Sequence, residues 1–240
     1  PGWLAPAGCE IATLATPDQD AAGALAALAD RLGAAAEAPV VAPGPQSPPP
    51  TGPLSPAAIG HSLLRALPDD AIVVDEANTC GLGIYPATAQ ARRHDWLTLT
   101  GGAIGDGLPL ALGAAIACPE RKVVALQADG SAMYTLQALW SMAREQADVT
   151  VVLLNNRSYA ILNIELARVG VGQPTPKTLS MLDLAQPDLD FVALASGMGV
   201  PATRATNAEE FDAQLAEAMA TRGPRLIEAM VVQQMPRSQP

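Results

Sequence analysis

Two apolar segments of the chain each end in polar residues, and a helical pattern lies between them. The segment "KVVALQAD" ends at Asp129, and "VTVVLLNN" ends at Asn155-Asn156. Between them, "SAMYTLQALWSMAREQ" has apolar residues at the spacing of one helix face and is expected to form a single helix. Apolar strands joined through a helix are typical of parallel strands covered on both faces. The pattern therefore indicates two neighbouring parallel strands whose polar ends meet at one edge of a sheet.

The same alternation extends from residue 55 to near the end of the chain. "SPAAIGHSLLRAL" is expected to be a helix capped by Ser55 with Pro56 at its first position, followed by a strand in "AIVVDEA". "LTLTGGAIGDGLPLALGAAIA" indicates a short strand, a glycine turn and a helix of small residues. "VPATRAT" and "PRLIEAMVV" are expected strands, and Asn207 with Glu210 predicts a capping box for the helix between them. The sequence predicts an α/β fold with a doubly wound, mainly parallel sheet and helices on both faces.

A proline-rich stretch, residues 37–56, is interpreted as a linker that divides the chain. Before it, "TPDQDAAGALAALADRLGA" predicts one helix that ends at Gly33. One helix cannot bury its own apolar face, so residues 1–36 are expected to be the remnant of a preceding domain. The main domain is predicted at residues 57–235, with a tail at 236–240. Because the chain begins at Pro1 and not at Met, it is expected to be part of a longer protein.

The composition narrows the class of protein. Apolar residues make up 49% of the chain and charged residues 16%, which favours a globular protein over a disordered one. With 24 acidic and 14 basic residues and no basic stripe, nucleic acid is not an expected partner. The longest apolar runs are shorter than the roughly 20 residues of a membrane-spanning helix, and no signal peptide is evident. Three widely spaced cysteines suggest no disulfide framework, so a cytoplasmic location is expected.

The polar residues at the strand ends favour a metal-bridged phosphate site. Asp129 and Asn155-Asn156 offer carboxylate and amide oxygens, which Mg²⁺ or Ca²⁺ prefers, with water and phosphate filling the remaining positions. Gly130 lets the backbone approach a ligand, and Ser131 at the start of a helix suits an anion. A second reading stays open, because Asp-Gly-Ser can be only a turn with a helix cap and Asn-Asn only a turn.

Three other kinds of site do not fit the sequence. The dinucleotide fingerprint fails because Gly105-Asp106-Gly107 is followed by Leu-Pro-Leu. A hydrolase nucleophile at Ser131 lacks its flanking glycines and a later histidine, since His61 and His94 both precede it. No cluster of soft ligands suggests zinc. The two histidines are interpreted as surface or structural groups.

The pair Asp129-Gly130, a spacer of 24 residues and Asn155-Asn156 resemble the thiamine diphosphate signature. With "LTGGAIGDGLPLALGAAIACPERKVVALQADGSAMYTLQALW", residues 55–235 resemble the diphosphate-binding domain of the acetolactate synthase and benzoylformate decarboxylase group. The segment before the linker resembles the end of that group's middle domain. The resemblance implies a thiamine diphosphate-binding fold.

The resemblance also implies a set of binding residues. Mg²⁺ would be bound by Asp129, by the side-chain oxygen of Asn156 and by the backbone carbonyl of Ser158. The diphosphate and the rest of the cofactor would contact Gly130, Ser131, Asn78, Thr79, Gly102, Ala103, Ile104 and Tyr159.

The resemblance also implies roles for Gly102 and Ile104, and the sequence departs from the family signature at Ala128. The Gly102 carbonyl would accept from the aminopyrimidine, and Ile104 would be the apolar wedge that bends the cofactor, although Ile104 as ordinary core stays an open alternative. Ala128 replaces the first glycine of the signature, which is tolerated if its backbone φ is not positive.

The implied activity is thiamine diphosphate- and Mg²⁺-dependent decarboxylation and carboligation of 2-oxo acids, like an acetolactate synthase large subunit in branched-chain amino acid biosynthesis. A benzoylformate-type decarboxylase is the first alternative, and a truncated, non-catalytic cofactor-binding or assembly module is another. No catalytic residue is expected in this chain. The activating glutamate would come from the pyrimidine-binding domain of a second subunit in a homodimer or homotetramer, so the fragment alone is expected to be inactive. FAD could accompany the full-length protein, but nothing in this segment indicates it.

Overall fold

The computed structural model describes residues 8–34 and 47–231, which belong to two units, residues 1–41 and 42–240. In the first unit, α1 (Ala21–Leu32) begins at Asp20, whose side chain accepts from the N–H of Gly23. It ends at Gly33, which has the left-handed φ of 64° that glycine adopts without strain. The predicted helix and its end are confirmed. No residue of α1 is buried.

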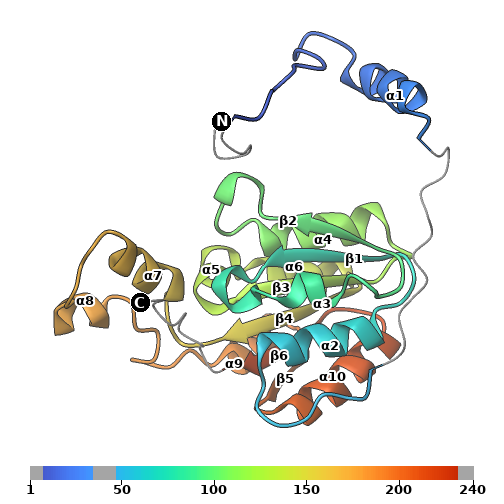
Figure 1. Cartoon of the computed structure of the whole chain (residues 1–240). Helices are drawn as coiled ribbons and strands as arrows, with labels where there is room; N and C mark the ends of the chain where they lie inside the picture. Colours follow the sequence, from blue (N-terminus) through green and yellow to red (C-terminus); the bar gives the residue numbers. More distant parts are fainter. Residues whose placement is uncertain (1–7, 35–46, 232–240) are drawn as a thin grey trace. The chain divides into compact units, whose positions relative to one another are not determined.

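The second unit is built on a six-stranded sheet in the order β2-β1-β3-β4-β6-β5, and all five pairings are parallel (Figure 1). The strands are β1 (Ala71–Glu76), β2 (His94–Thr98), β3 (Val123–Ala128), β4 (Val149–Asn155), β5 (Ala202–Ala205) and β6 (Arg225–Met230). The predicted parallel α/β sheet is confirmed. β3 and β4 are paired neighbours, as the opening pattern of the sequence predicted.

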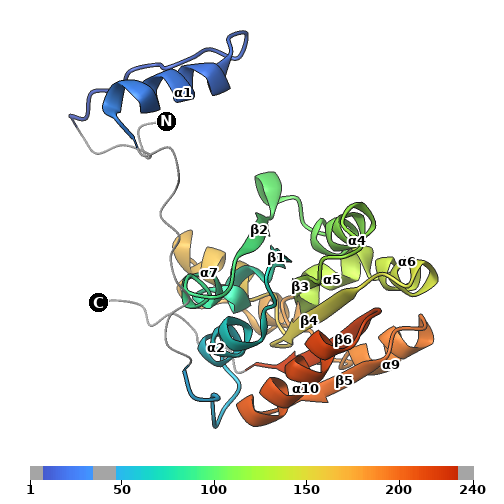
Figure 2. The same cartoon turned by 90° about the vertical axis from the view of Figure 1, so that its right-hand side faces the viewer.

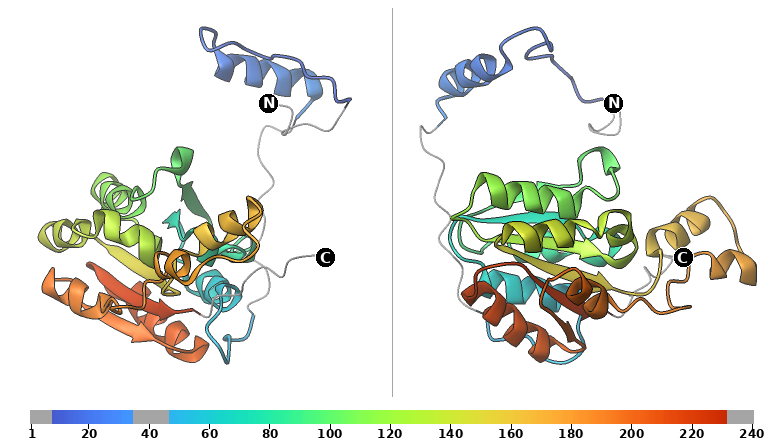
Figure 3. Two further views of the ribbon diagram at one scale, coloured as in Figure 1. Left: turned by 90° about the vertical axis from the view of Figure 1, so that its left-hand side faces the viewer. Right: turned by 180° about the vertical axis from the view of Figure 1, so that it is seen from behind.

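Helices cover both faces of the sheet (Figure 2). One face carries α2 (Pro56–Ala66), the short α3 (Ile84–Ala87) and α10 (Ala208–Ala220). The other carries α4 (Gly107–Ala117), α5 (Asp129–Thr135), α6 (Ala138–Glu145) and α9 (Phe191–Gly197). Two 3₁₀ turns, η1 (Asn78–Gly81) and η2 (Thr100–Gly102), follow β1 and β2. Figure 3 shows α7 (Ala160–Arg168) and α8 (Pro176–Ser180), coloured gold, beyond the carboxyl edge of the strands.

The core has two halves because successive side chains of each strand point to opposite faces. Val73 of β1 packs in the half that contains Leu63 of α2 and Phe211 of α10. Val74 packs in the other half with Leu108 of α4. Every residue of β3 and β4 is buried, which explains their continuous apolar sequence. Burial of each Leu or Phe side chain contributes about 1.5–3 kcal/mol to folding, so both layers stabilise the sheet.

The predicted helix over residues 131–146 is wrong as a single element. The structure has α5 and α6, separated at Leu136 and Gln137. There the N–H groups of Leu139 and Trp140 bond carbonyls three residues earlier, at Leu136 and Gln137, and not four. The backbone stays right-handed through this turn, and no glycine or proline marks it in the sequence.

The other helix starts are largely as predicted. Ser55 caps α2 by accepting from the N–H of Ala58, with a proline in the first turn. Asn207 caps α10 by accepting from the N–H of Glu210 at 2.8 Å. The reciprocal half of the capping box is wrong, because the Glu210 carboxylate accepts from the N–H of Thr206. The predicted strand in "LTLT" lies earlier, at His94–Thr98.

Part of the predicted domain organisation lies outside the described residues, namely linker residues 37–46 and the tail at 236–240. The boundary of the main domain at residue 57 stays a prediction. Within the described ranges, the helices are too short or too polar to cross a membrane.

Candidate functional site

The chain reverses its direction of travel across the sheet at β1. From β1 it adds β2 on one side and then crosses to β3 on the other, so the carboxyl ends of β1 and β3 flank a topological switch point. Ligands of open α/β sheets bind at such points. At this edge the structure buries polar side chains from four strands or their ends: Glu76, Gln127, Asp129, Asn155 and Glu228.

Asp129 is the centre of this edge. It is only 2% exposed and directly follows β3 at the start of α5. Its Oδ1 accepts from the N–H of Gly130 at 2.8 Å, and its Oδ2 accepts from the N–H groups of Asn156 at 3.1 Å and Arg157 at 2.7 Å. The carboxylate therefore binds two N–H groups of the turn that follows β4. The predicted meeting of the two strand ends is confirmed.

Burial dominates the electrostatics of Asp129. It raises the pKa of the carboxyl from 3.8 to about 6, while hydrogen bonds from backbone N–H groups, those of Gly130, Arg157, Asn156 and Ser158, lower it by less. Among the described residues, Asp129 forms no ion pair with a basic side chain. A cation beside this carboxylate would offset the cost of its burial.

The turn after β4 is held by side chains as well as by Asp129. The Asn156 Oδ1 accepts from the N–H of Ser158 at 2.9 Å, and its Nδ2 donates to the Cys80 Sγ at 2.8 Å. Burial, and then the charge of Asp129, raises the pKa of the Cys80 thiol to about 12. Because Cys80 belongs to η1, this contact brings the segment of Asn78 and Thr79 against the turn.

Gly130 and Ser131 are both buried at the start of α5. A Cβ on Gly130 would lie 2.5 Å from the Tyr159 ring, so glycine is required for this ring to pack here. The Ser131 hydroxyl accepts from the Gln127 side chain at 2.6 Å and donates to the Ala128 carbonyl at 3.2 Å. Any contact of Ser131 with an anion would therefore use its backbone N–H.

The segment Gly102–Ile104 lies on the exposed side of the loop between β2 and α4. Gly102 has φ of 72°, and Ala103 is exposed. Ile104 is 45% exposed, so its alternative interpretation as ordinary core of this chain is wrong. No hydrogen bond among the described residues joins this segment to Asp129 directly.

Glu76 anchors that loop and was not identified from the sequence. It is buried at the end of β1, and its carboxylate accepts from the N–H groups of Gly105 and Gly107 and from the Gln127 side chain. The acidic pair Asp75-Glu76 at the end of the apolar run in "AIVVDEA" was a visible signal. It was missed because β1 is not next to β3 in the sequence.

A groove of about 440 Å³ lies beside the site, between the ends of β1 and β2. Glu76 and Asn78 line it, together with Leu82 and Tyr85, but Asp129 and Asn156 do not. Of the predicted site residues, the structure thus brings together those after β1, β3 and β4. Gly102–Ile104 are exposed and do not line this groove.

The family described as "Thiamine pyrophosphate enzyme, C-terminal TPP binding domain" matches residues 81–229, which is more than half of the chain. The chain belongs to this thiamine pyrophosphate enzyme family. The predicted resemblance is confirmed.

Two curated proteins are similar in sequence to this chain. A Mycobacterium tuberculosis protein named "Putative acetolactate synthase large subunit IlvX" is 54% identical over 233 residues, which is 96% of this chain and 45% of that protein. Benzoylformate decarboxylase of Pseudomonas aeruginosa is 34% identical over 177 residues, or 74% of this chain and 32% of the decarboxylase. The chain spans less than half of the length of either relative.

Solved structures of two decarboxylases share the fold, and the first is described as thiamine diphosphate-dependent. The 4-hydroxybenzoylformate decarboxylase of Rhodococcus jostii RHA1 superposes with a TM-score of 0.72 at 31% identity, covering 89% of this chain and 40% of that one. Benzoylformate decarboxylase from Polynucleobacter necessarius gives 0.64 at 25% identity, covering 80% and 36%.

The residues present fit the cofactor of the thiamine pyrophosphate enzyme family. Ala128, the departure from the G-D-G signature, has φ of −76° and ψ of 149°, an ordinary extended conformation in which its methyl group costs nothing. The buried Asp129 carboxylate lacks a basic partner among the described side chains, and no described donor bonds the Ser158 carbonyl. These oxygens suit a hard cation that takes its remaining ligands from phosphate and water.

Proposed function

We propose that this chain is the cofactor-diphosphate domain of an enzyme that uses thiamine diphosphate and Mg²⁺ to decarboxylate a 2-oxo acid and join the product to a second one. The main support for the proposal is the buried Asp129 carboxylate at the switch point, which accepts hydrogen bonds from the N–H groups of Asn156 and Arg157. The 54% identity to the mycobacterial protein supports the acetolactate synthase-like form of this reaction.

Three oxygens of the chain would hold Mg²⁺: the Asp129 carboxylate, the Asn156 Oδ1 and the Ser158 carbonyl. Asn156 and Ser158 lie on the turn after β4, and the Asp129 carboxylate accepts from N–H groups of the same turn. Gly130 and the N–H of Ser131 would contact the diphosphate, with Asn78 and Thr79 on the opposite side. Tyr159 packs against Gly130 and would close the site from the side of α7.

Thiamine diphosphate, when bound, would supply the electron sink that accepts the electron pair left as CO₂ departs. The chain's own contribution is positioning and exclusion of water. The Gly102 carbonyl would orient the aminopyrimidine, and the exposed Ile104 would pack under the cofactor. The group that protonates the cofactor ring would come from a pyrimidine-binding domain of a second subunit in a homodimer or homotetramer.

A benzoylformate-type decarboxylase is the second candidate, because both solved neighbours described above are decarboxylases of that type. The two candidates differ in the second reactant. The synthase would join the decarboxylated substrate to a second 2-oxo acid, whereas the decarboxylase would protonate it and release an aldehyde. Residues 158–170, which include α7, lie beyond the carboxyl edge and would border the substrate.

Product analysis of the full-length protein tests this proposal. With thiamine diphosphate and Mg²⁺, pyruvate should release CO₂ and give acetolactate. Benzoylformate converted to its aldehyde would favour the decarboxylase instead.

The variant Asp129→Asn should lower the rate by at least about 10-fold, because mutation of even an outer partner of a metal site typically has an effect of that size. Asp69→Asn, on the opposite edge with a side chain 70% exposed, is the matched control and should keep full activity. Binding of the cofactor without either product would contradict the proposed reaction.

A further inference from the structure

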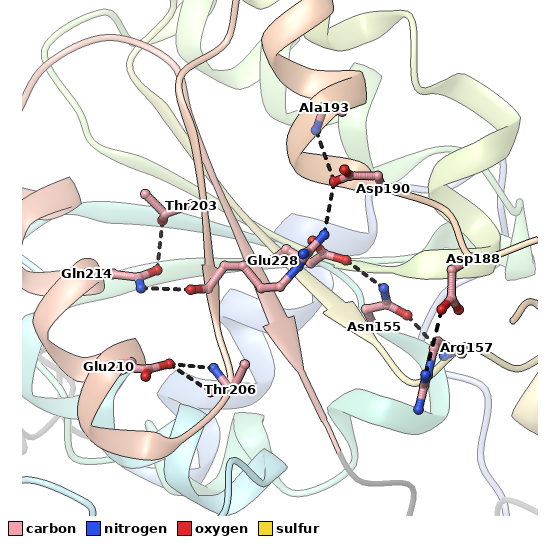
Figure 4. A network of polar contacts seen from close by, with 11 residues as sticks. Asn155, Arg157, Asp188, Asp190, Ala193, Thr203, Thr206, Glu210, Gln214 and Glu228 are labelled. Atoms are coloured by element: carbon pink, nitrogen blue, oxygen red, sulfur yellow. Dashed lines mark hydrogen bonds and ion pairs between the residues drawn. The ribbon is translucent and has the colours of Figure 1, made fainter.

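A network of polar contacts centred on a buried carboxylate lies at the ends of β4, β6 and β5 (Figure 4). Its centre is Glu228 of β6, whose carboxylate is 1% exposed. Glu228 Oε1 accepts from the Asn155 Nδ2 at 2.7 Å, and its Oε2 accepts from the Arg204 Nε at 2.8 Å. No other described donor bonds this carboxylate, so each of its oxygens has one assigned partner.

Glu228 determines which way the Asn155 amide points. A carboxylate can only accept hydrogen bonds, so the Asn155 Nδ2 must face it and the Asn155 Oδ1 must face the other way. There the Oδ1 accepts from the N–H of Arg157 at 3.0 Å. The same N–H also donates to the Asp129 Oδ2 at 2.7 Å. The network therefore ends on the N–H group that binds the central carboxylate.

Arg157 needs this support because its backbone is in the left-handed region, with φ of 57°. A residue with a side chain adopts this conformation at a cost, and it persists only where surrounding contacts hold it. The hydrogen bonds from its N–H to Asn155 and Asp129 are two of those contacts, and the bond from the Leu184 N–H to its carbonyl at 2.9 Å is a third. They also determine where Asn156 and Ser158, on either side of Arg157, present their oxygens.

We propose that Glu228 is a positioning residue for the cofactor: held by Arg204, it orients Asn155, which keeps the turn of Asn156 to Ser158 in the conformation that binds Mg²⁺ and diphosphate. The inference rests on the proposed function. It adds a role for residues that contact neither the metal nor the cofactor. Outer partners that orient metal ligands typically change metal affinity or activity by about 10- to 100-fold when mutated.

The variant Glu228→Gln tests the orientation directly. The glutamine amide has the same shape as the carboxylate, but only its oxygen accepts hydrogen bonds. Its N–H₂ group must therefore face either Arg204 or Asn155. If its oxygen stays on Arg204, the Asn155 amide has to rotate and turns its own N–H₂ toward the N–H of Arg157. Calorimetry of the folded variant with saturating Mg²⁺ should then show thiamine diphosphate binding weakened by about 10-fold or more.

Asn155→Ala breaks the same connection while the Glu228 and Arg204 pair stays intact. It should weaken binding by a similar factor, and the double variant should be no weaker than the singles because both changes remove one interaction. This variant also tests the proposal if Glu228→Gln fails to fold. The matched control is Asp190→Asn, which alters the outer partner of Arg204 at 2.9 Å and should leave affinity within about twofold.

A cofactor-free measurement separates this inference from the proposed function. In the apoprotein, amide hydrogen exchange of Arg157 should be about 10-fold faster in Glu228→Gln than in the wild type, while Leu153 within β4 is unchanged. Failure of the wild type to bind thiamine diphosphate would overturn the proposed function alone. Wild-type binding affinity in both Glu228→Gln and Asn155→Ala, or unchanged Arg157 exchange in both variants, would overturn the role of Glu228.

Discussion

At the scale of single residues, the candidate site depends on a carboxylate that is buried without a basic partner among the described side chains. Asp129 could be predicted from the sequence because β3 and β4 are consecutive and paired, so their polar ends had to meet. Glu76 and Glu228 could not be identified in this way. Their partners come from strands that are distant in the sequence, and side-chain orientation at such contacts follows from packing and not from a local pattern.

The raised pKa of Asp129 predicts a pH dependence of stability in the metal-free protein. The carboxyl has a pKa of about 6 when folded and an ordinary value of 3.8, so between these values the folded state binds more protons. Folding is therefore favoured as the pH falls from about 6 to 4, and this contribution is lost as the pH rises through 6. The full effect is on the order of 3 kcal/mol.

Urea unfolding with EDTA between pH 4 and pH 8 measures this effect. Relative to the wild type, Asp129→Asn should gain stability as the pH rises from 4 to 7, because it has no buried charge to form. Asp69→Asn should show no such trend. A difference between Asp129→Asn and wild type that does not vary with pH would contradict the assignment.

At the scale of elements, one buried carboxylate joins a loop, a helix start and two strands. Glu76 at the end of β1 accepts from the N–H of Gly105 in the loop and of Gly107, which begins α4. Through Gln127 of β3 it is also connected to Ser131. The helices and strands themselves were predictable from apolar periodicity and capping residues such as Ser55 and Asn207. The break between α5 and α6 was not, because both parts remain right-handed and share one amphipathic pattern.

The variant Glu76→Gln should destabilise the protein, because one of its three donors would face an amide N–H₂ in a buried position. The expected loss is about 1–3 kcal/mol of unfolding free energy, with faster amide exchange at Gly105 and Gly107. Glu217→Gln, with an exposed side chain, is the matched control. Wild-type stability in Glu76→Gln would show that the loop does not depend on this carboxylate.

At the scale of the whole molecule, the order of the six strands decides which residues can meet. The crossing from β2 over β1 to β3 creates the switch point, and it places η1 against the turn after β4 through the contact of Cys80 with Asn156. The sequence order alone could not predict this crossing. It could predict that strands of this apolar character would be parallel and covered on both faces, which is what positions the site at a single edge.

The central claim is that Asp129 and the turn after β4 form a Mg²⁺-dependent site for thiamine diphosphate. Isothermal titration calorimetry of the protein with thiamine diphosphate, in Mg²⁺ and in EDTA, tests it most directly. The structure predicts binding in Mg²⁺ that disappears in EDTA and in Asp129→Asn, and that is unchanged in Asp69→Asn. Equal binding in Mg²⁺ and in EDTA, or undiminished binding by Asp129→Asn, would contradict it.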